Sequence, residues 1–150
     1  MLTKNSIFPT GKRIITADGE GTLIFWDPRS PTPIFKLSPS DARFALDGVT
    51  SLAVNSSSTL AVVGGVSGGI RVISLSKGDV VGALEGHRED ESVEAVVFID
   101  LAGAGVGAGS GVVVTGGTDG KACIWDLSTM RLRATLEHEV NFSSSACCSL

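Results

Sequence analysis

The sequence holds few of the residues on which catalysis, metal binding and disulfide formation depend. Its 150 residues include two histidines, three cysteines and no tyrosine. The cysteines, at Cys123, Cys147 and Cys148, are odd in number and lack the spacing of a metal site. We therefore expect reduced thiols and a location in the cytoplasm, or also in the nucleus. We further expect no cofactor, no metal ion and no enzymatic activity.

Basic charge and long apolar runs are scarce as well. Lysine and arginine number 12 against 16 acidic residues, which gives a net charge of −4. This balance argues against a nucleic-acid binder whose affinity depends on a basic surface. No apolar run reaches the ~18 residues of a transmembrane helix, and Met1 to Phe8 lacks the apolar core of a secretory signal. We expect neither nucleic acid nor a membrane as a direct partner.

Short runs rich in Val, Ile, Leu and Thr make up most of the chain. They recur about every ten residues and are separated by Gly, Asp, Asn or Ser, which is typical of strands joined by tight turns. The best helix candidate, Ser40 to Leu46, is barely two turns long. Parallel sheets need long crossover connections, which are usually helical. The sequence therefore predicts antiparallel sheets and an all-β fold.

One pattern of strand, Gly/Asp turn, strand and Trp-Asp occurs twice in the chain. It covers residues 14–27 and 113–126, which are 99 positions apart (113 minus 14). Residues 62–75 carry a degenerate copy with Ile73 in place of the tryptophan. The steps from Trp26 to Ile73 and from Ile73 to Trp125 are 47 and 52 residues, slightly above the ~40–45 residues of WD repeats.

This pattern resembles the WD-repeat family of β-propellers, in which each blade is a four-stranded antiparallel sheet. The resemblance implies about three blades, near residues 6–37, 49–84 and 93–136, in a partial repeat domain at 1–139. Three blades do not close a ring, so we expect an open arc whose closure needs missing blades or another chain. We expect a truncated gene product with an irregular, non-native tail at 140–150.

The third copy carries residues that form a buried hydrogen-bonded chain in the WD-repeat family. In this sequence they would be His87, Thr115, Asp119 and Trp125. The first copy keeps only Thr16 and Trp26, and the second copy keeps no polar member. From the residues alone, a surface position of His87 is the alternative.

Five carboxylates lie within the ten residues around this histidine: Glu85, Glu89, Asp90, Glu91 and Glu94. On a propeller face they would attract a partner rich in Lys and Arg. The alternative is a solvated linker between blades.

Gly11-Lys12-Arg13 leads into the first Trp-Asp repeat, residues 76–82 close the second copy, and the acidic stretch is followed by residues 92–98. This order is similar to the central blades of the angio-associated migratory cell protein family and its fungal counterpart. The fungal member is a chaperone of a newly made large-subunit ribosomal protein. The resemblance implies a non-catalytic scaffold that binds a basic ribosomal protein in ribosome assembly. The alternative is a generic WD-repeat adaptor in signalling, trafficking or ubiquitin ligation.

A glycine-rich stretch at 103–111 invites a comparison with nucleotide-binding loops. Gly103, Gly105 and Ala108 fit the relaxed dinucleotide fingerprint. A phosphate site needs a helix after such a loop, however, and residues 112–115 read as a strand. We expect a long hairpin loop rather than a cofactor site.

Overall fold

The computed structural model describes residues 2–7, 12–99 and 111–138. The tail at 140–150 and the glycine-rich stretch, apart from Gly111, lie outside these residues. The side chains of β1 are not described either. Across the described ranges, no helix is long and apolar enough to cross a membrane.

The described residues form three antiparallel sheets of four strands each. The first sheet contains β1 (Leu2–Ile7), β2 (Ile14–Asp18), β3 (Leu23–Trp26) and β4 (Pro33–Leu37). The second contains β5 (Val49–Val54), β6 (Leu60–Gly65), β7 (Ile70–Ser74) and β8 (Asp79–Leu84). The third contains β9 (Val93–Ile99), β10 (Val112–Gly117), β11 (Lys121–Asp126) and β12 (Arg131–Glu137).

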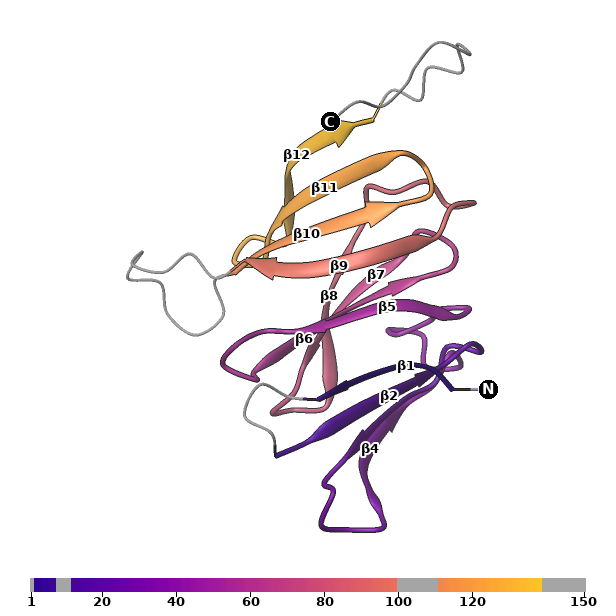
Figure 1. Ribbon diagram of the computed structural model, residues 1–150, viewed down its shortest axis with the longest axis vertical. Helices are drawn as coiled ribbons and strands as arrows, with labels where there is room; N and C mark the ends of the chain where they lie inside the picture. The colour runs from indigo at the N-terminus through magenta and orange to yellow at the C-terminus, as the bar shows by residue number, and fades with distance from the viewer. Residues whose placement is uncertain (1, 8–11, 100–110, 139–150) are drawn as a thin grey trace, which may run out of the picture.

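The three sheets follow one another along the long axis of the molecule and form an open arc (Figure 1). Strand β5 of the middle sheet packs against both β1 and β9. This arrangement confirms the predicted all-β fold of three four-stranded antiparallel blades. The first blade begins at Leu2 rather than near residue 6, because the polar residues of β1 give a weak strand signal in the sequence.

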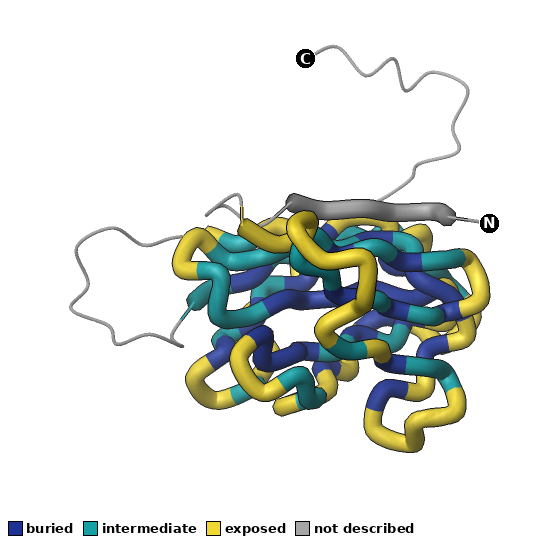
Figure 2. The backbone as a smooth tube through the Cα atoms, turned by 90° about the horizontal axis from the view of Figure 1, so that it is seen from below, coloured by how far each residue is buried: buried dark blue, intermediate teal, exposed yellow. Residues whose placement is uncertain are grey.

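Burial follows the position of each sheet in the stack. In β2 of the first sheet, buried and half-buried residues alternate, whereas Ala61 to Gly65 of β6 are all buried. Alternation indicates a strand with one covered face, and continuous burial indicates a strand with two. Figure 2 shows buried segments along the strands and exposed residues mostly in the turns.

Two apolar cores fill the junctions between the blades. The first core joins blades one and two and includes Phe25, Phe44 and Ile73, each at most 1% exposed. The second joins blades two and three and includes Val72 and Trp125. The middle blade contributes side chains to both cores, so each junction depends on it.

The connection between the first two blades forms a single helical turn instead of the two-turn helix considered from the sequence. The amides of Phe44 and Ala45 both donate to the carbonyl of Asp41, at 3.0 and 2.8 Å. The turn ends there because Ala45 adopts a positive φ of 34°. It buries Phe44 completely in the first core.

Candidate functional site

The structure brings the four residues singled out in the third blade into one hydrogen-bonded chain. The indole Nε1 of Trp125 on β11 donates to Oγ1 of Thr115 on β10 at 2.9 Å. Oγ1 of Thr115 lies 2.8 Å from Nε2 of His87. Nδ1 of His87 lies 3.0 and 3.1 Å from the two carboxylate oxygens of Asp119. The side chains of His87 and Asp119 are 0% exposed.

The numbers of donors and acceptors decide which group donates in each of these hydrogen bonds. Because Thr115 accepts from Trp125, its one hydroxyl proton is free to be donated to Nε2 of His87. Nδ1–H of His87 then donates to Asp119. Burial raises the pKa of Asp119, but hydrogen bonds from His87 and from two backbone amides outweigh it, so the pKa lies below its ordinary value.

The histidine fixes the connection between the second and third blades to the turn that joins β10 and β11. The amide of Arg88 donates to Asp119 Oδ2 at 3.2 Å. The hydroxyl of Thr118 donates to Oε2 of Glu91 at 2.6 Å and accepts from the amide of Ser92 at 2.9 Å. The connection is therefore hydrogen-bonded to the third blade at several points.

The second blade holds the same connection from the other side. Gly68 in the β6–β7 turn has a φ of +73°, and a Cβ placed there would lie 2.2 Å from the Arg88 carbonyl oxygen. A glycine lets the backbone of the connection approach this closely. The connection at 85–92 is thus held between two blades.

Most of the acidic residues of this connection are exposed to solvent. Glu85, Glu89, Asp90 and Glu94 are exposed and Glu91 is half-buried. In the described part of the chain, none of the five forms an ion pair, whereas carboxylates at the opposite ends of the strands do: Asp27 with Arg29 at 2.7 Å and Asp126 with Arg133 at 3.5 Å. One end of the blades therefore presents five carboxylates that form no ion pair with a described side chain. We call the segment 85–94 the acidic connection.

The first blade keeps half of the hydrogen-bonded chain. Trp26 Nε1 donates to Thr16 Oγ1 at 2.9 Å, as in the third blade. The turn uses a different carboxylate: Oδ1 of Asp18 accepts from the amides of Thr22 and Glu20 at 2.7 and 3.1 Å. Glu20, which occupies the aspartate position of the repeat, is exposed.

In the second blade an apolar set replaces the polar chain. Val63 and Ile73 occupy the threonine and tryptophan positions and are both 0% exposed. Leu46 takes the place of the histidine, because its Cδ2 lies 3.0 Å from a Cβ built on Gly65, just as His87 lies against Gly117. Nothing in the sequence singles out Leu46 for this place, since a leucine in a loop carries no polar signal.

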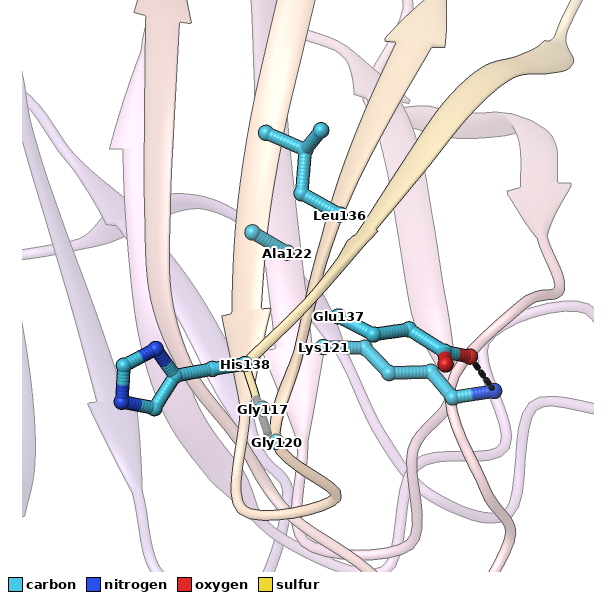
Figure 3. Close-up of a pocket in the computed structure, with 7 residues that line it drawn as sticks. All are labelled: Gly117, Gly120, Lys121, Ala122, Leu136, Glu137 and His138. Carbon is cyan, nitrogen blue, oxygen red and sulfur yellow. Dashed lines mark ion pairs between the residues drawn. The ribbon is translucent and has the colours of Figure 1, made fainter. Parts of the chain in front are cut away.

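A shallow depression lies on the outer face of the third blade (Figure 3). Its volume is about 460 Å³. Ala122 and Leu136 supply apolar surface, and Lys121 Nζ pairs with Glu137 Oε1 at 3.4 Å. His138 extends on the other side of the depression, away from this ion pair. Among the described residues, no three His, Cys, Asp or Glu side chains gather as a metal ion would require.

Comparison with known proteins agrees with this geometry. The family model "WD domain, G-beta repeat" matches residues 78–126, which include the histidine, threonine, aspartate and tryptophan of the third blade. The WD40 repeats of RRP9 superpose with a TM-score of 0.77 at 16% identity, over 91% of this chain and 38% of that one. The structure of U3-55K gives 0.78 at 16% identity, over 93% and 40%.

Residues 78–126 therefore match a WD repeat, and the three sheets have the fold of β-propeller blades. An uncharacterized WD repeat-containing protein of Schizosaccharomyces pombe is 29% identical over 86% of this chain. Human angio-associated migratory cell protein is 27% identical over 91% of the chain. The chain spans about a third of these relatives, 31% and 32% of their lengths.

Proposed function

We propose that this chain is a non-catalytic scaffold whose acidic connection binds a basic segment of a partner protein in the cytoplasm. More specifically, we propose that it acts as a chaperone of a basic large-subunit ribosomal protein. Similarity to angio-associated migratory cell protein supports it, because the family resemblance implies that role.

The unpaired carboxylates on a fixed backbone carry the proposal. Glu85, Glu89 and Asp90 are exposed, and hydrogen bonds and a close glycine contact hold the loop between two blades. A preorganised acidic surface loses less conformational entropy on binding than a free linker would. It also steers a positively charged partner toward the contact.

The test is the affinity of the chain for a fluorescent peptide rich in Lys and Arg, measured by anisotropy at low and physiological salt. Glu89→Gln combined with Asp90→Asn removes two negative charges from the acidic connection. We expect this variant to bind about tenfold more weakly at low salt, with a smaller difference when salt screens the charges.

The control is Ser56→Lys combined with Thr129→Lys. Both residues are exposed and lie in turns at the opposite ends of the strands. This variant changes the net charge by the same amount, so equal weakening by the two variants would show that only total charge matters. Unchanged affinity in the first variant would reject the acidic connection as the contact. Co-purification tests the proposed chaperone role: ribosomal proteins would support it, and ligase or coat subunits would contradict it.

A further inference from the structure

The two outer blades each leave one face uncovered by the described chain. On the third blade, Val97, Ile99 and Leu136 are 56%, 40% and 59% exposed. On the first blade, the uncovered face includes Ile14, Ile24 and Trp26, each half-buried. Comparison with the equivalent, buried faces of the other blades indicates which surface would pack on each of these two faces.

The uncovered face of the first blade repeats a face that is buried at the second junction. Ile14 pairs with Trp26 across β2 and β3, and Val113 pairs with Trp125 across β10 and β11 in the same register. The Val113 and Trp125 side chains pack against the second blade in the second core. The first blade therefore exposes the kind of surface that packs onto a preceding blade.

The uncovered face of the third blade repeats the surface that receives Trp125. On the second blade that surface has two cross-strand rows: Val62, Val72 and Gly82, and Gly64, Ile70 and Leu84. The third blade has the matching rows Val114, Ile124 and Ala134, and Gly116, Ala122 and Leu136. The depression at Ala122 and Leu136 belongs to this surface.

Side-chain size makes the match specific for a tryptophan-bearing face. In the first junction, the first blade contributes the bulky Phe25 and Phe35, whose ring centroids lie 3.8 Å apart. The second blade, which packs on them, has Ile73 in place of tryptophan. In the second junction, the second blade has the smaller Val72 and Gly82 at the positions of Phe25 and Phe35, and the third blade, which packs on them, carries Trp125. The third blade has Ile124 and Ala134 at these positions.

We infer that the chain associates head to tail, with the Trp26 face of one copy packed on the Val114–Ile124 face of a second copy. Each copy carries both surfaces of a blade junction, so two different surfaces meet in a heterologous contact, and each copy can use both of its surfaces. Two copies bring six blades together, within the four to eight of closed propellers.

Mass measurement by light scattering on the 150-residue chain tests this inference. We expect an assembly of twice 15.4 kDa for the unsubstituted chain. Val97→Glu on β9 and Ile24→Glu on β3 should each give monomers, because each places a charge in the contact. Val81→Glu on β8, where Val81 is 43% exposed on the middle blade, is the matched control and should leave the assembly intact.

Mixing the two monomeric variants is the decisive step. Each retains one intact face, so the mixture should form a one-to-one dimer. Circular dichroism checks that each variant folds. Ile14→Glu replaces Ile24→Glu on the first blade if the latter does not fold, and Leu136→Glu repeats the test on the third blade. A monomeric unsubstituted chain, or association that survives both Val97→Glu and Leu136→Glu, would overturn the inference.

Discussion

The hydroxyl of Thr115 should contribute much more to stability than the equivalent hydroxyl of Thr16. Thr115→Val keeps the shape of the side chain and leaves Trp125 Nε1 and His87 Nε2 without their shared partner. Each unsatisfied buried group costs about 1–3 kcal/mol, so the loss should be about 2–6 kcal/mol. Thr16→Val removes the partner of Trp26 alone. Because Trp26 is half-buried, water can replace that bond, and the loss should stay below about 1 kcal/mol.

Urea unfolding followed by tryptophan fluorescence measures both losses. With a slope of about 2 kcal/mol per molar, a loss of 3 kcal/mol lowers the midpoint by about 1.5 M. The two variants make the same chemical change at repeat-equivalent positions, so they differ only in what surrounds the hydroxyl. A loss for Thr115→Val no larger than that for Thr16→Val would show that the His87 chain is not a cooperative network.

Four further outcomes follow from the same structure. Val63→Thr should lower the unfolding free energy by about 1–3 kcal/mol in urea, because it buries a hydroxyl in the apolar set of the second blade. Asp119 has a lower pKa folded than unfolded, so its stabilisation is full above its ordinary value of 3.8 and is lost as pH falls through its folded value. Acid unfolding of Asp119→Asn should therefore be shallower than that of the unsubstituted chain. Gly68→Ala should be far more destabilising than Gly120→Ala in thermal melts: their φ values are +73° and +76°, but a Cβ at Gly68 lies 2.2 Å from a carbonyl oxygen and one at Gly120 lies 3.5 Å from the nearest described atom. Burial raises the pKa of Cys123, so peptide mapping should find this thiol unreactive toward iodoacetamide until the chain unfolds.

The internal repeat made much of the fold predictable from the sequence. Residues 14–26 and 113–125 share spacing, and the structure gives them the same strand register. The resemblance to the WD-repeat family implied that Trp125, Thr115 and Asp119 belong to one hydrogen-bonded network, because they stand at the positions where that family carries these residues. Buried polar groups need such partners.

Contacts between segments of different blades could not be predicted in this way. Leu46 lies three residues before β5 (49 minus 46), whereas His87 lies six before β9 (93 minus 87), so spacing does not align them. The fixation of the acidic connection depends on Gly68, which meets Arg88 through packing between blades. The carboxylates were visible in the sequence, but the backbone that holds them was not.

Hydrogen exchange with and without the basic peptide tests the proposed function most directly, because it locates the contact on the molecule. We expect the peptide to slow exchange within residues 85–94 and in the adjoining turn around Thr118, which is hydrogen-bonded to that segment. The turns at 55–59 and 127–130, at the opposite ends of the strands, should exchange as before. Protection confined to those opposite turns, with none in the acidic connection, would contradict the proposed function.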